Sequence, residues 1–251
     1  MNLDGAFRKL FKGGGIVLDC FVVEMGVSFF AKVVIARVLG PFDYGAVSLG
    51  VTTLGLLSTL SLLGLHASIG RYLPRFDTDE DRRGVIISGF QIALPVATVT
   101  GLAVVALANP IATHLFTDPA VTPYIRVFGF AIPFAALMKL SIGVVRGLQQ
   151  VVPKVVVQNV TPPVTRFTAV LLAVGIGAGA LGITTAYALA YVVAALVGLY
   201  FVFKQSPIRG PAKPSRMHGE LLTFSAPLIV SAAMAFVLSD LDTFMLGYFA
   251  S

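Results

Sequence analysis

Seven long runs of apolar residues constrain this chain more than any other feature. A helix needs about 20 consecutive, predominantly apolar residues to cross the hydrocarbon core of a bilayer. The runs that meet this length are 16–38, 44–65, 84–107, 122–144, 154–176, 181–203 and 224–249. Charged residues make up 12% of the chain, whereas a soluble domain has about 25%. The sequence therefore predicts an all-α integral membrane protein that crosses the bilayer repeatedly.

Lysine and arginine residues gather in alternate connections between these runs. They precede the first run, separate the second from the third, surround the turn between the fourth and fifth, and separate the sixth from the seventh. These residues are Arg8, Lys9, Lys12, Arg71, Arg75, Arg82, Arg83, Lys139, Arg146, Lys154, Lys204, Arg209, Lys213 and Arg216. The connections 109–122 and 175–182 contain neither residue type. The positive-inside rule therefore predicts a multi-pass protein of the plasma membrane with a cytoplasmic N-terminus.

The placement of the basic residues also accounts for the net charge of +6. Because the charges lie in short loops beside membrane spans, they report topology and do not point to nucleic acid as a partner.

Changes in composition divide the chain into four parts. Residues 1–12 alternate apolar and basic residues at helical spacing, which predicts an amphipathic helix on the membrane surface that ends at glycines 13–15. Residues 13–203 are expected to form a bundle of six transmembrane helices. The proline-rich, basic segment 204–218 is expected to be a cytoplasmic connector, and 219–251 the first helix of a second bundle. On this division the chain corresponds to one complete bundle plus one helix of a truncated second.

The first two runs are joined by residues 36–45 (ARVLGPFDYG). Proline lacks a backbone donor and biases the residue before it away from helical angles, so Gly40–Pro41 is expected to end the first helix. The second helix then crosses back. Further motifs follow in order: LGL at 63–65, SIGRYLP at 68–74, IPF at 132–134 and VRGL at 145–148.

Together these motifs resemble the polysaccharide flippases of the O-antigen type, which share a superfamily with the MATE exporters. The resemblance covers nearly the whole chain. It implies a MATE-like fold of two six-helix bundles related by a pseudo-twofold axis, with alternating access between them. It implies export of lipid-linked oligosaccharide or polysaccharide precursors, without a cofactor. The implied partners are a polyprenyl-phosphate or pyrophosphate glycan, membrane lipids, and a second half-transporter chain or a second copy.

Four basic residues lie outside the cytoplasmic groups: Lys32, Arg37, Arg126 and Arg166. A charge at the centre of a membrane helix costs roughly 2.5 to 3.5 kcal/mol on insertion scales, so these side chains should face protein or water. Arg126 lies near the outer end of its run and is expected to snorkel. Lys32, Arg37 and Arg166 are expected to bind an anionic head group.

Arg166 is the deepest of these cations, about 18 Å beyond the inner boundary marked by Lys154. It follows Thr161-Pro162-Pro163, and paired prolines free backbone carbonyls, which membranes tolerate only beside protein or water. The alternative is a packing kink in which Arg166 pairs with a carboxylate.

Three acidic residues complete the candidate set. Glu24 and Lys32 are about 80° apart around the first helix and about 12 Å apart along it. They are expected to line a common cavity or to pair separately with other helices. Asp240 and Asp242 are candidates for coupling a cation to transport, or are solvated at the outer interface.

Two other functions remain open. A cation-coupled MATE-type exporter of small organic molecules would favour acids in the cavity. A membrane-embedded glycan polymerase or transferase would need a long outer loop with catalytic residues, and 109–122 offers only His114 and Asp118. Neither a hydrolase triad nor a metal-ligand spacing is present among the three histidines and one cysteine, so an enzyme and a metal site are not expected.

Overall fold

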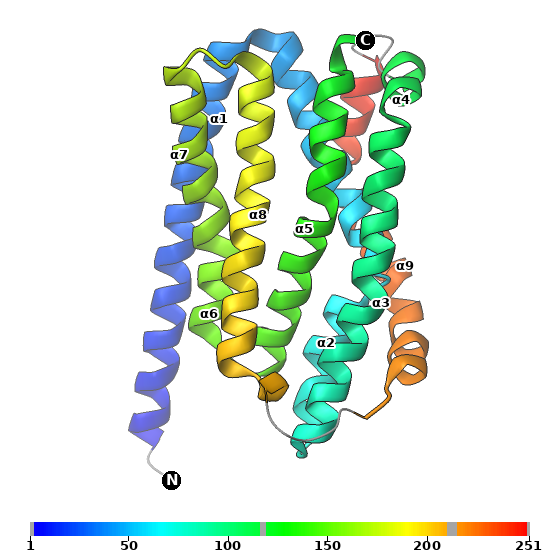
Figure 1. The fold of residues 1–251 in the computed structure, drawn as a ribbon. Helices are drawn as coiled ribbons and strands as arrows, with labels where there is room; N and C mark the ends of the chain where they lie inside the picture. Colours follow the sequence, from blue (N-terminus) through cyan, green and yellow to red (C-terminus); the bar gives the residue numbers. More distant parts are fainter. Residues whose placement is uncertain (1–2, 116–118, 210–214, 250–251) are drawn as a thin grey trace.

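The computed structural model describes residues 3–115, 119–209 and 215–249. Side chains before residue 21 and after residue 238 are outside the described part. The described residues form an all-helical structure without strands (Figure 1). The helices are α1 (Leu3–Ser61), α2 (Leu65–Tyr72), α3 (Asp79–Ala106), α4 (Ala108–Leu115), α5 (Thr122–Gly147), α6 (Val151–Val155), α7 (Thr161–Gly175), α8 (Gly179–Gln205) and α9 (His218–Phe249). Short 3-10 turns lie at Leu73–Arg75, Pro119–Val121 and Pro207–Arg209, and a π-helical turn, η3, lies at Val156–Val160.

The long helix α1 contains the predicted hairpin. Its backbone is non-helical at Gly40, with φ 74° and ψ 177°, directly before Pro41. Figure 1 shows the first arm rising at the left edge of the bundle, the chain crossing its top, and the second arm descending behind α5. A positive φ is readily adopted by glycine, which explains why the reversal falls at this residue.

The predicted helix break at glycines 13–15 is wrong. Helical backbone runs through these residues, and Gly40 is where α1 leaves helical geometry. Glycine lowers helix stability by about 1 kcal/mol per residue but does not forbid a helix. The surface position of residues 1–12 and the division into four parts stay predictions.

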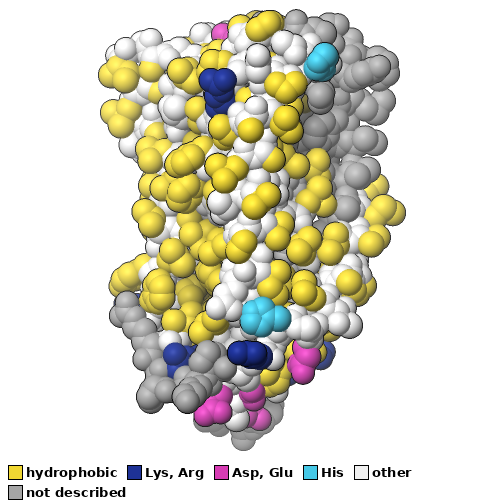
Figure 2. Space-filling model, turned by 45° about the vertical axis from the view of Figure 1, so that its right-hand side comes forward, with side chains coloured by type: hydrophobic (Ala, Val, Ile, Leu, Met, Phe, Trp, Pro, Cys, Tyr) yellow, Lys and Arg dark blue, Asp and Glu magenta, His cyan; other side chains and the backbone are white. Residues whose placement is uncertain are grey.

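Three helices within the described residues are long and apolar enough to cross a membrane by length and composition. They are Asp79–Ala106, the segment Pro119–Gly147 that contains α5, and Gly179–Gln205. Figure 2 shows a broad band of hydrophobic side chains across the middle of the molecule, with charged side chains gathered toward the lower end. The structure is therefore that of an all-α membrane protein. The total of seven spans, and six in one bundle, stays a prediction.

The chain segments that carry the four predicted basic groups reach the same end of the bundle, although Lys139 itself lies inside α5. The N-terminus, the α2–α3 connection, the C-terminal end of α5 and the C-terminal end of α8 all lie at the bottom of Figure 1. The connections before α5 and between α7 and α8 lie at the top. This arrangement agrees with the alternation on which the orientation was predicted.

The helix α5 lies at the centre of the packing. Its apolar stretch is 61% buried, against 39% for α3 and 44% for α8. Glycines allow neighbouring backbones to approach it closely, as is common between membrane helices. A Cβ atom on Gly143 would lie 2.4 Å from the carbonyl oxygen of His66 in α2, and one on Gly129 would lie 3.1 Å from that of Gly101 in α3.

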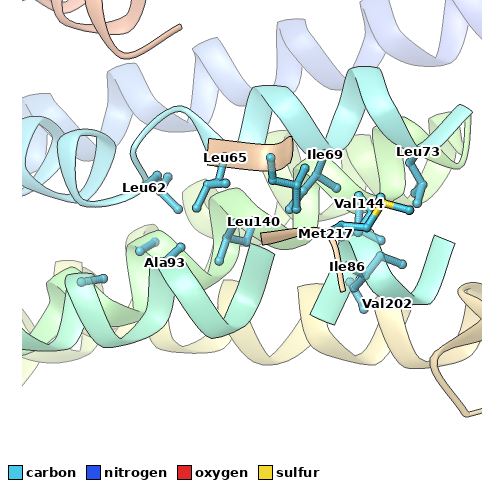
Figure 3. Close-up of a cluster of buried hydrophobic side chains, with 14 residues drawn as sticks. Leu62, Leu65, Ile69, Leu73, Ile86, Ala93, Leu140, Val144, Val202 and Met217 are labelled. Atoms are coloured by element: carbon cyan, nitrogen blue, oxygen red, sulfur yellow. The ribbon is translucent and has the colours of Figure 1, made fainter. Parts of the chain in front are cut away.

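The largest buried cluster joins Leu62, which directly follows α1, to α2, α3, α5, α8 and the start of α9 (Figure 3). It includes Leu62, Leu65, Ile69, Leu140 and Met217. Segments far apart in the sequence are thus held by one shared core.

Helix α3 begins earlier than its apolar run suggested. The Thr78 hydroxyl accepts from the backbone N–H of Asp81 at 3.3 Å, and Asp79, Glu80 and Asp81 occupy the first turn. The acidic stretch is partly helical because threonine caps the N-terminus and carboxylates stabilise it.

Candidate binding site between α1, α7 and α8

The π-helical turn η3 (Val156–Val160) opens the helix where the sequence places two prolines. Pro162 and Pro163 have no N–H to donate to the carbonyls of residues 158 and 159. The hydroxyl of Thr161 instead donates to the carbonyl of Val156 at 2.8 Å, and its backbone N–H bonds the same oxygen. The predicted opening of the helix is therefore present, as one widened turn.

An amide from this widened turn holds Glu24 of α1. The Nδ2 atom of Asn159 donates a hydrogen bond to Oε2 of Glu24, and both side chains are half-buried. A π-bulge displaces side chains from their usual positions and is frequent at functional sites. The sequence reasoning missed Asn159. Its position three residues before the paired prolines was the signal that could have identified it.

Arg166 lies two turns further along α7, roughly 10 Å from Asn159 at 1.5 Å per residue. Its guanidinium carbon lies 4.5 Å from the ring centroid of Tyr187 in α8, a cation–π contact. Its Nε atom is buried and has no hydrogen-bond partner. Tyr187 is buried in a cluster that also includes Tyr44 and Tyr191.

These are two separate contacts along neighbouring helices, and we call their four residues, Glu24, Asn159, Arg166 and Tyr187, the α1–α7 seam. A cation with an unused donor and a carboxylate lie along the same packed helices, α1 and α7. An arginine whose fork is partly free is suited to bind a carboxylate or phosphate. The packing-kink alternative required a carboxylate partner for Arg166, and the contact found in the described residues is instead aromatic.

The remaining predicted site residues are not part of this seam. Lys32 and Arg37 are exposed on α1, whereas Ala31 and Ile35 of the same helix are buried. Glu24 is half-buried on the same helix, and the expected common cavity of Glu24 and Lys32 stays a prediction. Arg126 is exposed near the start of α5, which suits its predicted snorkelling. The side chains of Asp240 and Asp242 lie outside the described residues.

Lys139 was assigned to the turn between the fourth and fifth runs, and this assignment is wrong. It lies inside α5, eight residues before the helix ends at Gly147. Its Nζ donates to the Gly55 carbonyl, the Ser58 hydroxyl and the Thr59 hydroxyl at 3.1, 2.7 and 2.7 Å. Ser58 and Thr59 are two of several hydroxyl residues in the apolar run 44–65, so the sequence did not single them out.

No group of three or more His, Cys, Asp or Glu side chains in the described part of the chain could hold a metal ion. The site is defined by its cation, its aromatic ring and its amide–carboxylate pair.

An all-helical bundle with an apolar belt and a cation inside it defines a membrane protein. The role in polysaccharide metabolism comes from its family. The model of the polysaccharide biosynthesis protein family matches residues 10–251. The chain therefore belongs to this family, that of the O-antigen and polysaccharide flippases, as its motifs indicated. No curated protein and no solved structure gives a significant match.

Proposed function

We propose that this protein moves lipid-linked oligosaccharide or polysaccharide precursors across the membrane. The substrate is a glycan on a polyprenyl phosphate or pyrophosphate. The family supports a role in polysaccharide biosynthesis, and the observation that carries the transport proposal is the buried, unused Nε of Arg166 beside Tyr187. An anionic head group that enters an apolar bundle needs such a donor, because an unpaired buried charge is costly.

The seam is suited to binding and release rather than to bond cleavage. Arg166 supplies positive charge and Tyr187 supplies a flat face, while Asn159 already engages Glu24. We therefore propose a transporter and not an enzyme.

Transport of a glycan between the two leaflets also requires a second protein surface that lines the other side of its path. The first arm of α1 exposes Lys32 and Arg37 among large apolar side chains, including Phe29 and Phe30. We propose that a second bundle packs on this face and that the glycan passes between the two, since alternating access occurs at such interfaces.

We propose a cytoplasmic N-terminus in the plasma membrane. Single cysteines placed in 109–122 should react with an impermeant thiol reagent in intact cells, and those placed in 204–218 should not. Labelling of the second segment from outside would overturn the orientation.

The direct test substitutes Arg166. Arg166→Glu reverses the charge that attracts the head group, so export of glycan in a cell that depends on this protein should fall about 100-fold, equivalent to about 2.7 kcal/mol. Arg166→Lys keeps the charge but loses the planar fork, so a smaller loss is expected. Protein level in the membrane is measured in parallel. Unchanged export by Arg166→Glu at an unchanged level would reject the proposal.

A further inference from the structure

A second buried cation lies outside the α1–α7 seam, where the membrane hairpin meets α5. Lys139 is half-buried, about 12 Å before the end of α5 at 1.5 Å per residue. Its three hydrogen bonds end on Gly55, Ser58 and Thr59, all within the last two turns of α1. No carboxylate of the described residues pairs with this ammonium group.

The hydroxyls of this cluster are oriented to accept hydrogen bonds from Lys139. The hydroxyls of Ser58 and Thr59 each donate to the Gly55 carbonyl, at 3.0 and 2.7 Å. Each hydroxyl proton is thereby used, so the oxygen lone pairs are left to accept from Lys139. A lysine ammonium has three donors, and all three are satisfied here.

The position of the cluster favours positive charge. α1 ends at Ser61, so Ser58 and Thr59 lie in its last turn, where the helix dipole favours positive charge. The distances of 2.7 to 3.1 Å are those of hydrogen bonds. They exceed the roughly 2.3 to 2.6 Å of calcium–oxygen bonds, so the oxygens surround an ammonium-sized ion and not a small metal ion.

The cluster lies directly before a break in the helix. Between α1 and α2, Leu63 has φ 48° and Gly64 has φ 73°. A Cβ atom on Gly64 would lie 2.8 Å from the carbonyl oxygen of Ser225 in α9, so α9 closes over the break. Figure 3 shows Leu62 and Leu65, on either side of the break, beside Leu140. A left-handed leucine persists only where its surroundings hold it.

We propose that the Gly55 carbonyl and the hydroxyls of Ser58 and Thr59 form a binding site for a monovalent cation of ammonium size, and that Lys139 is its tethered occupant. The Lys139 side chain, fixed to α5 at one end and bonded to α1 at the other, holds the break between α1 and α2 against α5. Removal of the lysine amine leaves a site that a small free ammonium ion can enter. This inference does not depend on the proposed transport function.

The test measures thermal unfolding of the purified full chain in detergent micelles. Lys139→Ala should lower the midpoint by about 5 to 10 °C, because a loss of this size follows from breaking several charged hydrogen bonds in a chain of this length. Ammonium or methylammonium chloride should restore at least half of the loss. Choline chloride at the same ionic strength should restore none, because its cation is too large for the site.

Lys139→Met is the matched control. Methionine fills the space of the lysine stem with an apolar end, so ammonium should not raise its midpoint above the value in choline. An unchanged midpoint in Lys139→Ala, or equal recovery in ammonium and choline, would overturn the proposal.

A second measurement keeps lysine in place and therefore serves even if the Lys139 variants do not fold. Acylation of the folded protein, read by mass spectrometry, should modify exposed Lys204 and spare Lys139. The double variant Ser58→Ala, Thr59→Val should raise acylation of Lys139 several-fold and leave Lys204 unchanged. Equal protection of Lys139 in the double variant and the wild type would show that the three oxygens do not hold it.

Discussion

Lys139 and Arg166 are both cations inside the bundle, yet their surroundings differ. All three donors of the Lys139 ammonium group bond to neutral oxygens near the C-terminal end of α1. Arg166 lies against the Tyr187 ring and retains a buried Nε without a partner. A cation whose donors are all satisfied within the protein stabilises the fold, whereas one with an unused donor can bind a ligand. The number of unsatisfied donors, and not depth in the membrane, separates the two roles.

The largest effect on stability is expected from removing Lys139, and removing Arg166 provides the comparison. Lys139→Ala breaks three charge-assisted hydrogen bonds, so the free energy of unfolding should fall by about 3 kcal/mol. Arg166→Ala removes one cation–π contact and should cost about 1 kcal/mol. Denaturant titration of both purified variants in the same detergent provides the comparison. Equal losses would remove the distinction drawn between the two cations.

The close approach of α2 and α5 near Lys139 predicts the next effect. Gly143→Ala places a methyl group 2.4 Å from the His66 carbonyl oxygen, which must shift backbone and should cost about 1 to 3 kcal/mol. Gly26→Ala in α1 is the matched control, because nothing lies within 4 Å of its added Cβ. Thermal unfolding should show a lower midpoint for the first variant and an unchanged or higher one for the second. The same result for both would mean that the tight packing around α5 is unimportant.

The Glu24–Asn159 pair of the seam should give a smaller effect than the loss of Lys139. Either single change, Glu24→Ala or Asn159→Ala, should cost about 1 to 2 kcal/mol. The double variant should cost no more than the larger single loss, because the two groups share one interaction. Glu24→Gln tests the charge while keeping an oxygen acceptor for Asn159. Additive losses in the double-mutant cycle would show that the contact contributes little.

The helical hairpin and the helix opening before the prolines at 162–163 could be predicted because their causes are local. A proline removes a hydrogen-bond donor wherever it lies, and a glycine before it permits the positive φ found at Gly40. The break expected at glycines 13–15 was wrong because glycine alone permits a bend without requiring one. A local signal is reliable where it removes an interaction and unreliable where it only lowers a preference.

The sequence by itself was enough to predict the membrane class, the alternation of basic connections and the family. It also identified Arg166 as a candidate site residue. Each of these depends on composition or on spacing along one helix. Only the tertiary structure decided which polar groups meet: Asn159 with Glu24, Arg166 with Tyr187, and Lys139 with Gly55, Ser58 and Thr59. These partners lie on different helices, and their contacts follow from how each helix is rotated and placed against its neighbours. Helical periodicity places a residue on a face, but only packing decides what that face contacts.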